Sequence, residues 1–456
     1  MTKSRFAISK GALVVWIISY LFFLVTLVNN FSASHDSIHY LNDIVKSTNL
    51  FHQHHLLYHF LANKWLVFWQ GFFSCGNYRS LGEVMNAGGG RLFCQPHYLI
   101  ESFTALWGSS ALTMVYLFLR KRFYLTRSAA WLGTAVVACS YGVWFYSVNI
   151  EVYLPPLFFI LWCLFILTKK EFAKTDIWKI AILHSLAILF HQVNILFTLV
   201  VLYSLIRNKF YASLLTYAVL GIIITGGMYF ITGWFIEGHN TVAAWVGWMQ
   251  GYTVGHDYWQ PLSAKTPLHV VTGFGHAFIG GHYIFQLPAA VYYLHNSFQS
   301  HGLKDEIFLS SKISSSTAWI LSGLTVLFAT LLLTLIIKFI FKCRSMKLHY
   351  PVISPLLITL IVYSAFFCFW MPEILEFWIL QMVIVWLLLI GMMPILHFPF
   401  RLQMNTGLMI VAVLLFVINY FGSIYWLQRP GRDWYYAETK IISQSVSPGD
   451  LIIVCL

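Results

Sequence analysis

The chain has 456 residues, of which 59% are hydrophobic and 10% charged. Its mean hydropathy of +0.72 excludes an ordinary soluble domain, and its net charge of +12 is spread over short basic clusters between apolar runs, a pattern that does not suit nucleic acid. Runs of about 20 apolar residues recur, the length needed to cross a bilayer. The sequence therefore predicts an all-α polytopic membrane protein.

Lys3, Arg5 and Lys10 precede the first apolar run, at 11–31, and place the N-terminus in the cytoplasm. This run is too long for a signal peptide and lacks a small-residue cleavage site, so we expect a retained helix. With the later basic clusters inside, further spans are expected at 98–119, 128–147, 152–168, 212–236, 318–340, 350–370, 378–396 and 405–426. Two large loops, 32–97 and 237–317, then face outward.

The apolar stretch 180–206 is flanked by basic residues at both ends. A single span would leave one basic end outside, whereas two short helices turning at 191–194 would keep both ends inside. Each short helix would be only about 18 Å long at 1.5 Å per residue. We favour the pair, which gives about eleven membrane helices within 1–426. The tail 427–456 would be extracytoplasmic and resembles the start of a soluble domain, so the natural chain could continue past Leu456.

The stretch SASHDSIHY follows the first run and opens the first outer loop. Asp36, His39, Tyr40 and Asp43 have the spacing of one helix face. Asp36 would stand near the helix N-terminus, where the dipole favours a carboxylate, and could accept a proton from a hydroxyl nucleophile. The alternative is that Asp36 only caps the helix.

The next stretch, FHQHHLLYHF, places His52, His55 and His59 on one helix face. Their spacing suits a metal, but no cysteine or acid in that helix completes a site, so no metal or other cofactor is expected. Polar contact with a headgroup or phosphate is favoured. The segment that follows, with Lys64, is typical of an amphipathic helix lying in the membrane interface.

Three later stretches carry further polar groups at or near the membrane. YSVNIEVYLPP contains Glu151, and LFHQVN contains His191 at membrane depth, which is either functional or a hydrogen bonder between packed helices. FWMPEILEFWI contains Glu373 and Glu376, which an interfacial aromatic belt does not explain. The second large loop adds polar residues to which no chemistry is assigned: His256, Asp257, His269, His276 and His282.

Two of the seven cysteines, Cys75 and Cys94, share one hydrophilic stretch on the predicted outer side. Disulfides persist on that side, so we predict a bond between them, the alternative being two unpaired thiols. Closing a loop of about 19 residues stabilises a protein by about 3 kcal/mol in the chain-entropy model.

SHDSIHY, FHQHHLLYHF, NIEVYLPPLFFILW and LAILFHQVNILF resemble, in this order, segments of the GT-C superfamily of membrane glycosyltransferases. Within it, the chain is most similar to the bacterial protein O-mannosyltransferase-like branch, glycosyltransferase family 39. The resemblance covers roughly residues 11 to 200. FHQHHLLYHF departs from that branch's HPPGYPLY-like stretch, because it lacks the proline-glycine pair.

The resemblance implies an inverting glycosyltransferase of a bacterial inner membrane. Its donor would be a sugar on a polyprenyl phosphate, and its acceptor a hydroxyl of a protein, lipid or glycan. Asp36 would be the base and Glu151 would orient the substrates. Donor phosphate or sugar contacts would come from His39, His52, His55, Lys64, His191 and Glu376. A transporter or lipid flippase is the alternative, although no second half of the chain echoes the one broken helix pair.

Overall fold

The computed structural model describes residues 10–30, 34, 36–75, 94–251, 258–288, 290–292, 304–345, 351–399, 402–429 and 431–447. Within these residues the regular structure is helical, apart from one antiparallel bridge between Trp259 and Trp370. The all-α prediction is therefore confirmed for the described part of the chain.

Within the described residues, four helical segments are long and apolar enough to cross a membrane. They are α5 (Pro96–Lys121), the segment Tyr211–Ile236 that begins with α11 (Tyr211–Gly221), α17 (Ser315–Ser345), and the segment Met404–Leu427 that begins with α21 (Met404–Asn419). A fifth arises if α6 (Arg127–Ala138) and α7 (Tyr141–Ser147), bent by 71°, form one span. The chain is thus an integral membrane protein, and the figure of eleven spans stays a prediction.

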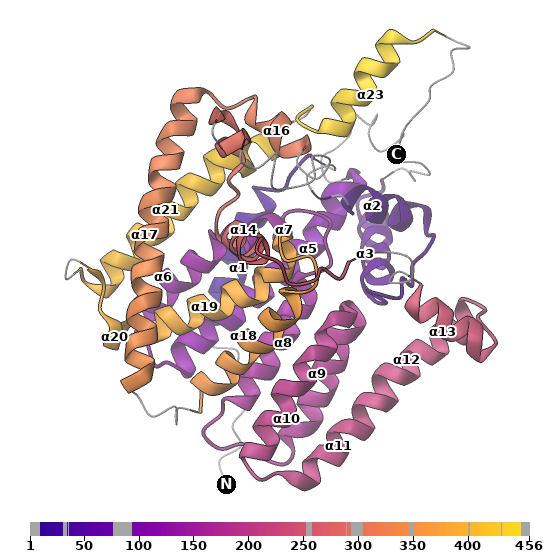
Figure 1. Cartoon of the computed structure of the whole chain (residues 1–456). Helices are drawn as coiled ribbons and strands as arrows, with labels where there is room; N and C mark the ends of the chain where they lie inside the picture. The colour runs from indigo at the N-terminus through magenta and orange to yellow at the C-terminus, as the bar shows by residue number, and fades with distance from the viewer. Residues whose placement is uncertain are drawn as a thin grey trace.

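Shorter apolar helices occupy most of the remaining predicted spans. They are α1 (Lys10–Leu24), α8 (Leu154–Leu167), α18 (Ile353–Phe367) and α19 (Ile379–Gly391). α5 is packed at the centre, against α1, α6 and α8, and two-thirds of its apolar window is buried. α17 buries only 17% of its window and stands at the edge of the bundle (Figure 1).

The stretch 180–206 is a broken pair. It is built from α9 (Asp176–Phe190), the 3-10 helix η2 (Gln192–Leu196) and α10 (Phe197–Arg207). The ring of Phe172, before the pair, lies 5.2 Å from the ring of Phe210, after it. The Nε2 atom of His184 in α9 lies 2.8 Å from the carbonyl oxygen of Asn194 in the turn. Both ends of the pair therefore lie on one side of the bundle, as expected for the favoured arrangement of two short helices.

Short helices gather at the opposite end, which is the upper end of Figure 1. They are α2 (Ser37–Lys46), α3 (Tyr58–Phe72), α16 (Lys304–Ser310) and α23 (Trp434–Ser445). α2 buries Tyr40, Leu41 and Ile44, because these positions share one helix face. The side-chain amide of Asn63 in α3 donates to the carbonyl of Ile44 at 2.8 Å. The two helices thus form one unit above the spans.

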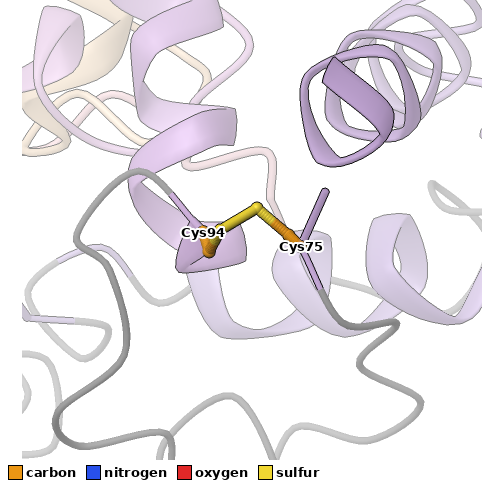
Figure 2. The surroundings of a disulfide bond; sticks show 2 residues. All are labelled: Cys75 and Cys94. Carbon is orange, nitrogen blue, oxygen red and sulfur yellow. A yellow bond between two sulfur atoms is a disulfide. The ribbon is translucent and has the colours of Figure 1, made fainter. Parts of the chain in front are cut away.

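A disulfide joins Cys75, after α3, to Cys94, before α5 (Figure 2). Their Cα atoms are 5.3 Å apart. Trp65 of α3 also donates its indole N–H to the carbonyl of Leu99 in α5, at 3.0 Å. The loop between the cysteines, with Gly88, lies outside the described residues. The bond fixes α3 to the start of the central helix, and α3 in turn holds α2.

We expect peptide mapping of unreduced protein to recover Cys75 and Cys94 as one linked species. Cys343 and Cys368 are partly exposed and serve as internal controls, because they should react with a thiol reagent without reduction. Replacing both bonded cysteines by serine should lower the free energy of unfolding by about 3 kcal/mol. Free alkylation of Cys75 and Cys94 in unreduced protein would contradict the pairing.

Candidate functional site

A cavity of about 1850 Å³ opens beneath α2, between the bundle and the second large loop. Its walls come from α2, α7 and α17, together with α14 (Thr266–Phe278), the 3-10 helix η5 (His282–Gln286) and the 3-10 helix η7 (Leu375–Trp378). One end is rich in carboxyl, phenol and imidazole groups, and the other is apolar.

Asp36 lines the polar end of this cavity and precedes the first turn of α2. Its side chain makes no capping hydrogen bond, so the capping alternative does not describe it. Instead its Oδ2 accepts a hydrogen bond from the Tyr40 hydroxyl, at 3.1 Å. Burial, and then the negative charge of Asp36, hold the pKa of Tyr40 well above its usual value. Tyr40 therefore stays protonated and remains a donor to the carboxylate.

Glu151 lies behind the same end of the cavity, between α7 and α8, and is 1% exposed. One of its carboxyl oxygens accepts from the Ser34 hydroxyl, and the other accepts from the backbone N–H of Val152 at 3.3 Å. The Ser37 hydroxyl contacts the side-chain oxygen of Asn149 at 3.0 Å. These contacts hold the turn at 149–151 against the start of α2. Burial, and then the charges of Glu376 and Asp36, raise the pKa of Glu151 well above its usual value.

Glu376 of η7 completes a group of three acids, Asp36, Glu151 and Glu376, which we call the acidic cluster. Its two carboxyl oxygens accept from the hydroxyls of Tyr146, at 2.9 Å, and Tyr153, at 2.5 Å. Burial, and then the charge of Asp36, raise the pKa of Glu376 to about 7. Three segments far apart in the sequence thus place their acids within electrostatic reach of one another.

The predicted histidines lie beside the acidic cluster. The rings of His52 and His55 stack with centroids 4.3 Å apart, and His59 lies 4.7 Å from His55. No group of three His, Cys, Asp or Glu among the described residues is placed to hold a metal. Burial, and then the neighbouring His54, lower the pKa of His52 to about 3, so this ring is neutral at pH 7.

The broken helix pair supports this histidine segment. The backbone N–H of Gln192 donates to the carbonyl of His54, at 2.8 Å, and that of Leu57 donates to the carbonyl of Leu189, at 3.1 Å. His191 lines the cavity, with its ring 5.0 Å from the ring of Tyr153. The turn between α9 and α10 therefore holds both His191 and the histidine segment near the acids.

The other predicted residues are more scattered. His39 is exposed and lines the cavity, whereas Lys64 is exposed on α3, outside the lining, with its ammonium 5.3 Å above the ring of Phe60. The Glu373 carboxylate accepts a hydrogen bond from the Gln260 amide at 3.1 Å, and Nδ1 of His269 lies 3.6 Å from the same carboxylate. The predicted outer-loop residues His256 and Asp257 lie outside the described residues.

The apolar end of the cavity is one face of α17, which we call the α17 wall: Thr325, Phe328, Ala329, Leu332, Leu333 and Ile336. These positions follow the 3–4 residue spacing of a single helix face. From the first to the last they extend about 16 Å at 1.5 Å per residue. The cavity thus joins a polar site to an apolar groove that runs along a membrane helix.

Tyr146 and Tyr153, which hold Glu376, were not selected from the sequence, and His276 and His282, which also line the cavity, were assigned no chemistry. Tyr146 and Tyr153 stand on either side of Glu151, within a turn already selected for that acid. Nothing in the sequence joined them to Glu376, more than 220 positions away, because only the packing of η7 against α7 brings the groups together.

No protein-family model and no curated protein matches the chain. Among solved structures, the chain is similar to the crystal structure of ArnT from Cupriavidus metallidurans in the apo state. The TM-score is 0.40 and the identity 11%, over 85% of this chain and 78% of that chain. A likeness at this level establishes neither a shared fold nor a shared activity.

Proposed function

We propose that this protein is a membrane glycosyltransferase of the GT-C type. It moves a sugar from a polyprenyl-phosphate donor to a hydroxyl acceptor on the extracytoplasmic side of the membrane. One observation carries the proposal: a single cavity joins the acidic cluster to the α17 wall. A substrate with a long apolar chain and a polar head matches such a cavity, because apolar walls bind the chain while a few polar groups orient the head.

In the proposed reaction Asp36 is the general base. Its carboxylate takes the proton of the acceptor hydroxyl as the acceptor oxygen attacks the anomeric carbon of the sugar. The bond from that carbon to the phosphate oxygen breaks, and the phosphate leaves with the electron pair. Attack opposite the leaving phosphate inverts the anomeric configuration. The proton on Asp36 then passes to water.

The remaining polar groups orient the substrates. Glu151 acts through Ser34, which lines the cavity and donates to it. Glu376, held by two tyrosine hydroxyls, presents a fixed acceptor or, when protonated, a fixed donor to a sugar hydroxyl. We assign His39, His52, His55 and His191 to polar contacts with the sugar or the acceptor. Lys64 stands at the membrane interface, away from the lining.

The proposal is tested with purified protein in detergent and a polyprenyl-phosphate donor carrying a radiolabelled sugar. We expect label to move to a hydroxyl acceptor, and no transfer from the matching nucleotide-activated sugar, which lacks the apolar chain. A transporter or flippase makes the opposite prediction. It would leave the bond between the sugar and the phosphate intact in detergent, but it would move the labelled lipid between the leaflets of a reconstituted vesicle. Movement of the labelled lipid between leaflets without sugar transfer in detergent would overturn the proposal.

A further inference from the structure

We propose that His276 and His282 form the phosphate subsite of the cavity, where they bind the phosphate that joins the donor's lipid chain to its sugar. This inference rests on the proposed function and assigns the phosphate to residues other than those expected from the sequence. The proposal stands on the geometry of the pair, on its place between two unlike ends of the cavity, and on the charges around it.

The two imidazoles come from adjacent elements and both line the cavity. His276 lies on α14 and stacks on the ring of Tyr141, with centroids 5.3 Å apart. His282 begins η5, with its ring 5.8 Å from Tyr141 and 6.2 Å from His276. His282 is only 3% exposed, and its Nδ1 has no hydrogen-bond partner within the described structure. A buried ring nitrogen of this kind is suited to a ligand atom.

The turn between the two histidines packs closely against Tyr141 and is fixed by hydrogen bonds. Gly281 has φ +73°, a conformation that glycine adopts without strain. A side chain at Gly280 would come within 2.9 Å of the Tyr141 ring. Asn419 of α21 fixes the turn, because its side-chain oxygen accepts the N–H of Gly280 at 3.0 Å and its amide donates to Phe278 at 2.9 Å. The histidines are therefore held in place without a ligand.

The pair lies between the two ends of the cavity. On one side Phe278, two residues after His276 on α14, contacts Phe328 of the α17 wall, with ring centroids 6.2 Å apart. On the other side α7 leads from Tyr141, at its start, to Tyr146, which donates to Glu376. A lipid-linked sugar with its chain on the α17 wall and its sugar at the acidic cluster would place its phosphate between them, beside His276 and His282.

Charge points to the same position. Among the described lining residues, Lys265 is the one lysine or arginine, and it is exposed. The acidic cluster repels a phosphate, so the anion needs donors away from it. Neutral imidazole has one N–H donor per ring, and the His276 ring already makes a hydrogen bond with the backbone of Gly280. Protonation gives each ring a second N–H, which the phosphate can accept. Burial lowers the pKa of His276 to about 4 and that of His282 to about 3, so the empty site carries no charge at pH 7, and a bound phosphate would favour protonation.

The experiment compares two probes that differ only in the phosphate: a polyprenyl phosphate without sugar, and the polyprenol of the same chain length. Binding to detergent-purified full-length protein is followed by tryptophan fluorescence. The phosphate preference is the Kd for the polyprenol divided by the Kd for the polyprenyl phosphate. We expect a preference of roughly tenfold to a hundredfold in the wild type. The double variant H276Q/H282Q should bring it to about one.

His269→Gln is the matched control, because this residue lies on the same helix and lines the same cavity beside Glu373. It should keep the wild-type preference. Glu306→Gln is a second control, since α16 packs against η5 and removal of a negative charge there should not weaken phosphate binding. If the double variant is not monodisperse, the single variants H276Q and H282Q decide, and each should lose part of the preference.

The outcomes separate this inference from the proposed function. A wild-type preference that survives in H276Q/H282Q, or is absent from the wild type, overturns the phosphate subsite. If such a wild type still transfers sugar from the lipid-linked donor, the proposed function stands and only the subsite is wrong. A wild type that binds neither probe and transfers no sugar overturns the proposed function itself.

Discussion

Replacing Asp36 by asparagine should lower the rate of sugar transfer at least about 100-fold, the scale of a general base. Asparagine keeps the size of the side chain. Its amide oxygen can still accept the hydrogen bond that the Tyr40 hydroxyl donates to Oδ2 of Asp36 at 3.1 Å in the wild type. The variant should therefore fold and bind donor, but it cannot take a proton from the acceptor. The measurement is the rate of transfer at saturating donor, together with the donor Kd.

Asp43→Asn is the control for this change. Asp43 stands on the same helix and lines the same cavity, but its carboxylate contacts the exposed Thr48 hydroxyl at 3.3 Å and the Asn49 amide at 3.4 Å. Its loss should leave transfer within a few-fold of the wild type. Equal activities of D36N and the wild type would remove Asp36 from the mechanism. Equal losses in D36N and D43N would indicate a general effect of charge at the cavity.

Much of the fold could be predicted because hydropathy and charge dominate the behaviour of a membrane chain. Long apolar runs at 98–119, 212–236, 318–340 and 405–426 match helices that satisfy their backbone hydrogen bonds internally. The basic residues at both ends of 180–206 were enough to favour the broken pair. The bend between α6 and α7 was not predicted. The two residues that separate these helices are Cys139 and Ser140, and neither is a proline or a glycine that would indicate a break.

The site was predictable one residue at a time, but its arrangement was not. Asp36, Glu151 and Glu376 each stood out because an acid beside an apolar span needs an explanation. Their association depends on tertiary contacts: Ser34 with Glu151, and Tyr146 and Tyr153 with Glu376. The pair His276 and His282 had no pattern of its own in the sequence, because its environment comes from α7, α17 and α21.

A tryptophan at Ala329 should obstruct the α17 wall and weaken binding of long-chain donors. Ala329 lies between Phe328 and Leu332 on the wall, where a small side chain leaves space in the cavity. Three buried methylene groups of a displaced lipid chain are worth roughly 2.4 kcal/mol, about fiftyfold in affinity. We therefore expect A329W to raise the KM for a long polyprenyl donor by at least about tenfold, with little change in kcat.

The same variant should affect a donor with a very short prenyl chain much less, since such a chain covers little of the wall. Leu327→Trp is the matched control, because Leu327 is 58% exposed on α17 but does not line the cavity, so its indole would face the surrounding lipid. It should leave the KM for both donors unchanged. If A329W raises the KM equally for long and short chains, the lipid does not lie along α17, and the cavity no longer argues for a lipid-linked donor.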